Sequence, residues 1–90
     1  MLNAFRIWLL EKNYSVLTSE DYRGRIERLC KKEQFTLEHL AKNIKSILPL
    51  YEQNGSKACY GRRSHGSVRA SLHHFSAFLS DCSVKFENAN

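Results

Sequence analysis

Apolar residues recur every three to four positions in four separate stretches of this 90-residue chain, and no stretch alternates apolar and polar residues as a strand would. That spacing puts the apolar side chains of each stretch on one face of an α-helix. A single proline and four glycines leave few points at which a helix must break. The pattern therefore predicts an all-α fold, a compact bundle of four helices, or five if a short segment after the proline is also helical.

The first two predicted helices occupy the first third of the chain. The first spans about residues 3–13, and a broad apolar face that includes Ile7 predicts deep packing. The second begins at about Thr18, where Thr18 and Asp21 are expected to form a capping box. Its apolar stripe ends near Glu33.

The last two predicted helices are separated by a long irregular segment. Thr36 is expected to cap the third helix, which bends or stops just before Pro49 because proline cannot continue the hydrogen-bond ladder. Residues 54–66 are rich in Gly, Ser, Lys and Arg and contain no acid, which predicts a loop. The fourth helix is expected to begin at Ser64 or Ser67.

Basic residues outnumber acidic ones, and their placement is uneven. Fourteen Lys or Arg against nine Asp or Glu give a formal charge of +5, which suits an anionic partner. Five basic side chains between Tyr22 and Lys32 accompany one acid, Glu27, and four between Lys57 and Arg69 accompany none. These segments predict a single basic surface if the second and fourth helices lie side by side. Such a surface fits either DNA or an acidic protein partner.

The order of motifs resembles that of a known family. The chain reads FRIWLLEKNYS, then LTSEDYRGRIERLCKK, and later SHGSVRASLHHFSAFL. This order is similar to that of the N-terminal, SAM-like core-binding domain of phage-type integrases, which are tyrosine recombinases. The resemblance extends from about Ala4 to Leu79. The matching positions are Trp8, Leu9, Thr18, Tyr22, Ser64, Ser67, Leu72, Phe75, Phe78 and Leu79.

The resemblance implies a module that clamps duplex DNA during integration or recombination. It implies a helical core-binding domain over residues 1–82, and the start of a linker toward a catalytic domain over residues 83–90. Self-association of the full-length recombinase on DNA is also implied. The segments picked out by charge and the family's DNA-contacting helices coincide. They nominate Arg23, Arg25, Arg28, Lys32, Lys57, Arg62, Arg63, Ser64, His65, Ser67, Arg69 and His73 as DNA contacts.

The sequence predicts no catalytic or metal site. The family's active site uses a His-x-x-Arg pair and a Tyr nucleophile, and no histidine here is followed by arginine at the third position, so the chain is not expected to cut DNA. The four tyrosines are interpreted as core or loop residues, and the histidines as solvent-facing. The cysteines and histidines between Cys59 and Cys82 lack the ligand spacing of structural zinc sites. No cofactor or small-molecule substrate is expected.

The cellular setting is predicted from cysteines and hydropathy. Three cysteines form no Cys-x-x-Cys pair, and no signal peptide is recognisable, which favours a reducing compartment. The longest apolar run, Ile7–Leu10, is far too short to cross a bilayer, so no membrane contact is expected. Together with the resemblance, this predicts a cytoplasmic protein of a bacterium or phage.

Overall fold

The computed structural model describes the backbone of residues 1–88 and the side chains of residues 1–63 and 66–82. Every regular element in this part is helical, which confirms the predicted all-α class. Six α-helices and one 3-10 helix, η1, follow one another along the described backbone. They are α1 (Leu2–Glu11), α2 (Val16–Glu33), α3 (Leu37–Lys42), α4 (Ile44–Ile47), η1 (Leu48–Tyr51), α5 (Ala58–Gly61) and α6 (Arg63–Asn88).

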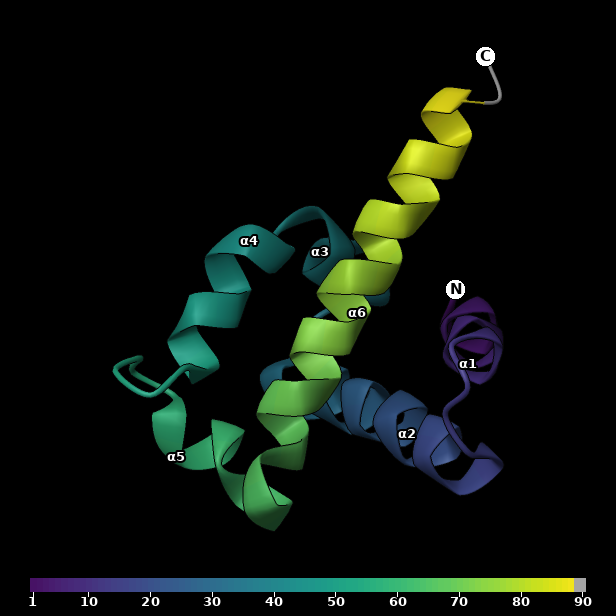
Figure 1. Ribbon diagram of the computed structural model, residues 1–90. Coiled ribbons are helices and arrows are strands. Elements are labelled where there is room, and N and C mark those ends of the chain that lie inside the picture. Colours follow the sequence, from purple (N-terminus) through teal and green to yellow (C-terminus); the bar gives the residue numbers. More distant parts are fainter. Residues whose placement is uncertain (89–90) are drawn as a thin grey trace.

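The long helix α6 runs through the whole molecule (Figure 1). Helix α2 crosses it, and α1 lies on one side of it, while α3, α4 and η1 lie on the other. Helix α5 leads from that second side to the start of α6. Helix α2 contacts α6, so the two helices that were predicted to carry the basic faces pack against each other.

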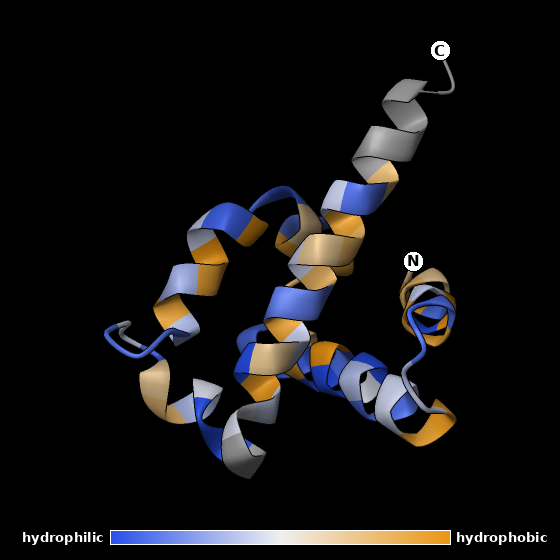
Figure 2. Ribbon diagram, in the orientation of Figure 1, coloured by the Kyte–Doolittle hydropathy of each residue, from blue (hydrophilic) through white to orange (hydrophobic). Residues whose placement is uncertain are grey.

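Aromatic and aliphatic side chains from the helices fill the core. Phe5 of α1 packs edge-on against Phe75 of α6, with ring centroids 5.3 Å apart. Ile26 of α2 and Tyr51 of η1 are fully buried. Hydrophobic and hydrophilic residues are interleaved along each helix (Figure 2), as expected of helices with one buried face. Ile7 is 42% exposed, so α1 packs through a narrower stripe than the sequence predicted.

Helix α2 begins earlier than the sequence predicted. Its N-cap is Ser15, whose Oγ accepts a hydrogen bond from the backbone N–H of Thr18 at 3.0 Å. The predicted Thr18–Asp21 capping box is therefore wrong, because Thr18 lies inside the helix and Asp21 pairs with a side chain one turn later. The helix ends at Glu33, as predicted, and Gln34 follows it in the left-handed conformation (φ 59°).

The third predicted helix is divided into two. Thr36 caps α3 as predicted, since its side chain accepts a hydrogen bond from the backbone N–H of His39 at 3.0 Å. Asn43 then leaves the helical conformation (φ −113°, ψ 18°), and its side-chain amide donates to the His39 carbonyl oxygen at 2.9 Å. Pro49 ends α4 as predicted, and the chain tightens into η1 there.

The predicted loop over residues 54–66 is partly helical. Helix α5 occupies its middle and packs tightly on η1. A Cβ atom on Gly61 would lie only 2.2 Å from the carbonyl oxygen of Tyr51, so this position has no room for a side chain. A four-residue helix is too short to show a hydrophobic period, which explains why the sequence pattern did not reveal it.

Helix α6 is longer than predicted. It begins at Arg63 rather than at Ser64 or Ser67, and it continues to Asn88, past the predicted end near Cys82. The sequence after Cys82 has no hydrophobic period, and such a period reports one buried face rather than helicity itself. The backbone of the predicted linker is therefore helical as far as Asn88, and its side chains lie outside the described residues.

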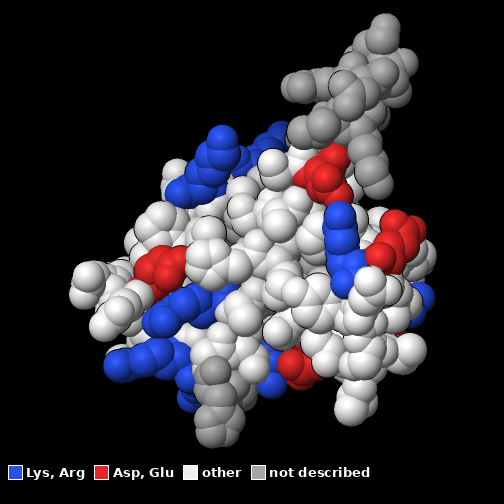
Figure 3. Space-filling model, viewed as in Figure 1, with Lys and Arg blue, Asp and Glu red and all other residues white. Residues whose placement is uncertain are grey.

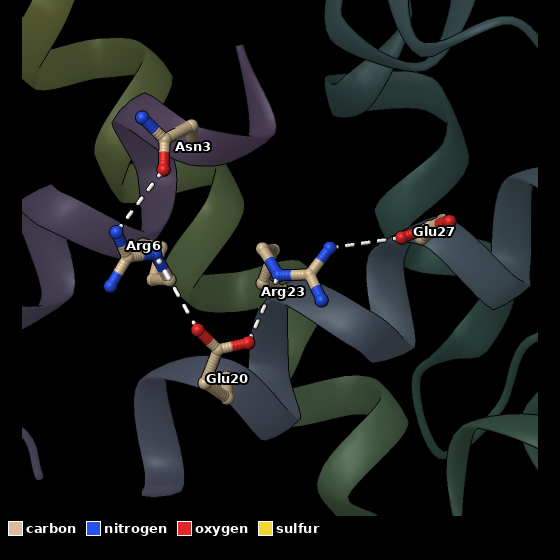
Figure 4. Close-up of polar contacts among 5 residues, drawn as sticks. All are labelled: Asn3, Arg6, Glu20, Arg23 and Glu27. Atoms are coloured by element: carbon tan, nitrogen blue, oxygen red, sulfur yellow. Dashed lines mark hydrogen bonds and ion pairs between the residues drawn. The ribbon is translucent and has the colours of Figure 1, made fainter. Parts of the chain in front are cut away.

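A chain of polar contacts joins α1 to α2 (Figure 4). Arg6 donates a hydrogen bond to Asn3 at 3.2 Å, and its Nε lies 3.6 Å from the carboxylate of Glu20. Arg23 in turn pairs with Glu20 at 3.4 Å and with Glu27 at 2.9 Å. Exposed ion pairs of this kind contribute at most about 1 kcal/mol each, so the network orients α1 more than it stabilises it.

Candidate nucleic-acid interface

Helices α2, α5 and α6 meet around the ring of Tyr60. Lys32 Nζ, in the last turn of α2, lies 4.6 Å from the ring centroid, and Arg63 Cζ, at the start of α6, lies 5.5 Å from it. Both distances are within cation–π range. Figure 3 shows lysine and arginine side chains gathered over α5 and the start of α6. We call this surface, made by Lys32, Lys57, Arg62 and Arg63, the basic corner.

The carboxylate of Glu33 holds the basic corner together. It accepts hydrogen bonds from Tyr51 Oη at 2.9 Å and from Lys57 Nζ, and it lies 3.5 Å from Lys32 Nζ. Its side chain is only 13% exposed. The Lys57 ammonium holds the pKa of Glu33 below its ordinary value, whereas burial, followed by the Glu33 contact, raises the pKa of Tyr51. Glu33 thus fastens the segment before α5 to the end of α2.

Arg62 and Arg63 of the basic corner are both exposed. Arg62 lies near Cys59, with 3.6 Å between Nη2 and Sγ, and Arg63 lies over the tyrosine ring. In the part of the chain that the structure describes, neither has an acidic partner. The sequence contains no Asp or Glu between Glu52 and Asp81. Their charges are therefore open to an anion from outside the protein.

The basic residues of α2 have a different environment. Arg25 Nε lies 2.9 Å from the carboxylate of Asp21, and Arg23 pairs with Glu20 and Glu27. The charge count between Tyr22 and Lys32 included only one acid, but helical spacing brings Glu20 and Asp21 back onto this face from the preceding turn. Much of the expected basic face of α2 is consequently neutralised.

Arg28 is the exception on α2. Its side chain is exposed and has no acidic partner among the described residues. The guanidinium folds over Gly24, where an added Cβ would lie 3.1 Å from Nη1. Arg28 lies one turn before Lys32, so the two share a face of the helix and extend the basic corner along α2.

Arg69 and His73 face η1. Arg69 Nε donates a hydrogen bond to the Tyr51 carbonyl oxygen at 3.0 Å and lies 3.8 Å from the Glu52 carboxylate. Its Nη2 is buried without a hydrogen bond in the described part of the structure. His73 Nε2 also contacts Glu52. These two predicted DNA contacts therefore tie α6 to the end of η1, and both have Glu52 as an acidic partner.

The remaining predicted contacts are serines and a histidine at the start of α6. Ser67 lines a groove of about 610 Å³ with residues of α2, and its carbonyl oxygen accepts a hydrogen bond from Ser71 Oγ at 2.6 Å. The side chains of Ser64 and His65 lie outside the described residues. Gly66, between His65 and Ser67, has a positive φ of 82°, so the first turn of α6 is irregular.

His74 is packed rather than solvent-facing. Its ring stacks on Tyr22, with centroids 4.9 Å apart and an interplanar angle of 26°, and meets Tyr14 edge-on at 5.0 Å. Burial, and to a lesser extent the neighbouring His73, lowers the pKa of His74. The His74 ring joins α6 to α2, and the expectation of a solvent-facing side chain is wrong here.

The sequence pattern did not predict the two residues, Tyr60 and Glu33, that contact the cations of the basic corner. Tyr60 was interpreted as a core or loop residue because α5 is too short to show a pattern. Glu33 meets Lys57 across a long sequence separation, which no local spacing reports. The acids that neutralise α2 did leave a signal, since counting one helical turn beyond the basic segment would have found Glu20 and Asp21.

Comparison of the chain with models of known protein families, with curated proteins and with solved structures gave no match. Among the described side chains, no three His, Cys, Asp or Glu residues lie close enough to hold a metal ion. Within the same part of the chain, no helix has both the length and the hydropathy needed to cross a membrane. The three cysteines are free thiols.

Proposed function

We propose that this chain is a module that binds duplex DNA through the basic corner and Arg28. The observation that carries the proposal is the pair Arg62 and Arg63. They are adjacent, exposed and without an acidic partner among the described residues. Exposed cations without an acidic partner can neutralise phosphates and so release the counterions condensed on DNA. This release supplies most of the affinity of a non-specific complex.

The start of α6 adds to this potential. Free N–H groups and the helix dipole favour an anion at the N-terminus of a long helix. Arg62 and Arg63 lie at that terminus. A phosphate there would meet two guanidinium groups and the dipole together. The contacts in such a complex would be mainly to the backbone, which positions the protein without specifying a base sequence.

The biological role proposed for the module is that of the N-terminal core-binding domain of a tyrosine recombinase. Its support is the motif order described above, together with an all-α fold in which α2 and α6 pack against each other. In this role the module would grip DNA in the cytoplasm of a bacterium or phage-infected cell. The strand cleavage would belong to a separate catalytic domain.

A titration of ¹⁵N-labelled protein with a duplex of about twenty base pairs at low and moderate salt tests the DNA-binding proposal. We expect backbone amide shifts at residues 28–32 and 57–63 that weaken steeply as salt rises. Amides near Glu11 and Tyr14, far from the basic corner along the chain, serve as the internal reference. If no amide in the two segments moves at low salt, the proposal is wrong.

A second candidate function is that of a protein-interaction module. Val16 and Leu17, in the first turn of α2, are 64% and 83% exposed, and Leu17 borders the groove beside Ser67. Exposed apolar side chains beside a groove are typical of protein contact surfaces. Under this alternative the basic corner would meet an acidic protein, and a Leu17→Ser variant would lose that partner while duplex DNA had no effect on either segment.

A further inference from the structure

A groove lined by basic residues lies between the α3–α4 turn and the later part of α6. Its volume is about 490 Å³. Lys42 and Lys45 line one wall, and Ser76 and Ser80 line the other. No Asp or Glu is among the described residues that border it, and neither lysine has an acidic partner in the described part of the structure. None of these four residues belongs to the basic corner.

The break at Asn43 shapes this groove. Asn43 leaves the helical conformation (φ −113°, ψ 18°), so α3 ends before it and α4 begins after it. Lys42 and Lys45 stand on either side of this break and both reach the groove. On the opposite wall, Ser76 and Ser80 are one helical turn apart and share a face of α6. Ammonium and hydroxyl groups are thus brought together from three helices.

The acids nearest to these residues in the sequence do not line the groove. Asp81 follows Ser80 directly, but its carboxylate accepts a hydrogen bond from Trp8 Nε1 at 2.7 Å and lies 3.8 Å from Lys12 Nζ, on the α1 side of α6. Glu38 lies one turn before Lys42, yet it does not border the groove. The described residues that line the groove therefore carry two positive charges and no carboxylate.

We propose that this groove binds the phosphates of the same duplex that the basic corner contacts. Lysine ammonium groups and serine hydroxyls are ordinary partners of backbone phosphates. Figure 3 shows basic side chains over α4 and over α5 on one face of the molecule. The proposal rests on the DNA-binding function above and extends it to a second surface.

The spacing of the two sites suits one duplex. From Arg63 to the midpoint between Ser76 and Ser80, the helix rises by about 22 Å at 1.5 Å per residue. That distance corresponds to about six or seven base-pair steps of 3.4 Å along the axis of a duplex. A duplex lying along α6 can therefore contact the basic corner and the groove together, and α6 sets the distance between them.

The test compares two double variants of equal charge change. Binding of a fluorescent duplex is measured at several salt concentrations for the wild type, for K42A/K45A and for K12A/K31A. Lys12 and Lys31 already have acidic partners, Asp81 and Glu27, so they form the matched control. We expect K42A/K45A to flatten the log–log salt slope by about 1.8, so that a fourfold rise in salt weakens the wild type about tenfold more than this variant.

The serines give a second, independent readout. The S76A/S80A variant is expected to bind about two- to tenfold more weakly with an unchanged salt slope, because the hydroxyls carry no charge. Thermal unfolding of each variant establishes that the fold is intact. Equal slopes for K42A/K45A and K12A/K31A would overturn the groove proposal while leaving the DNA-binding function standing. Failure of the wild type to bind the duplex at low salt would overturn both.

Discussion

Helix α2 and the corner formed by α5 and α6 both carry clustered basic residues, but the acids around them differ. On α2, Arg23 and Arg25 each lie 2.9 Å from a carboxylate of the same helix. At the corner, Arg62 and Arg63 have no acidic partner among the described residues. A paired guanidinium contributes little field at a distance, whereas an unpaired one can meet a phosphate without first losing a partner. The position of the acids therefore distinguishes the two regions more than the number of basic residues does.

The largest effect on the free energy of unfolding is expected when the glycine in each of the two regions is replaced by alanine. Gly61→Ala puts a Cβ 2.2 Å from the Tyr51 carbonyl oxygen, so the backbone of the corner must shift. We expect a loss of about 1–3 kcal/mol in the free energy of unfolding. Gly24→Ala on α2 meets only the flexible end of Arg28 and should be neutral or stabilise by up to about 1 kcal/mol. Urea unfolding compares the two, and similar losses would contradict the difference in packing.

A smaller effect is expected from the Glu33 contacts. Its pKa in the folded protein lies below the ordinary value of 4.5, so its contacts stabilise the fold fully above that pH and are lost as the pH falls through the lowered pKa. Glu33→Gln should cost about 1 kcal/mol at pH 7 and remove this part of the acid sensitivity. Unfolding by urea at pH 7 and at lower pH measures both.

Glu27→Gln on α2 is the comparison for this effect. The pKa of Glu27 is also lowered, first by its hydrogen bond with Arg23, but this carboxylate is far more exposed than that of Glu33. Its contribution should therefore disappear in high salt, whereas that of Glu33 should persist. The same salt dependence for both variants would show that the corner is no better shielded than α2.

The smallest effect is expected at the ring of Tyr60. Tyr60→Leu removes the cation–π contacts that position Lys32 and Arg63, and each is worth about 0.5–1 kcal/mol at an exposed site. The affinity for duplex DNA should fall about two- to fivefold with the salt slope unchanged. Tyr14→Leu serves as the control, since its ring contacts Tyr22 and His74 rather than a cation. Equal losses in both variants would remove Tyr60 from the site.

Much of the fold could be predicted from the sequence, because a helix with one buried face has apolar residues at regular intervals in its sequence. The all-α class, the end of α2 at Glu33, the Thr36 cap and the stop before Pro49 all follow from local rules and are confirmed. The Ser15 cap was missed because two neighbouring hydroxyl residues, Ser15 and Thr18, both fit the N-cap role. The break at Asn43 was not predicted, because no proline marks that position.

The site was less accessible than the fold. Charge counting selected the segment from Lys57 to Arg69, which contains no acid. Charge counting could not show that Arg69 binds the end of η1 whereas Arg62 is exposed. That difference depends on where η1 ends in the folded chain. Contacts such as that between Glu33 and Lys57 join residues distant in the sequence and become visible only in the folded chain.

The most direct measurement compares the salt dependence of DNA binding in R62A/R63A and in R23A/R25A, two variants with the same change in net charge. If the unpaired arginines bind phosphates, R62A/R63A should flatten the log–log slope of DNA affinity against salt concentration by about 1.8. The second should leave the slope close to that of the wild type, because its arginines are already paired on α2. A slope that changes equally in both variants, or more in R23A/R25A, would contradict the assignment of the interface to the basic corner.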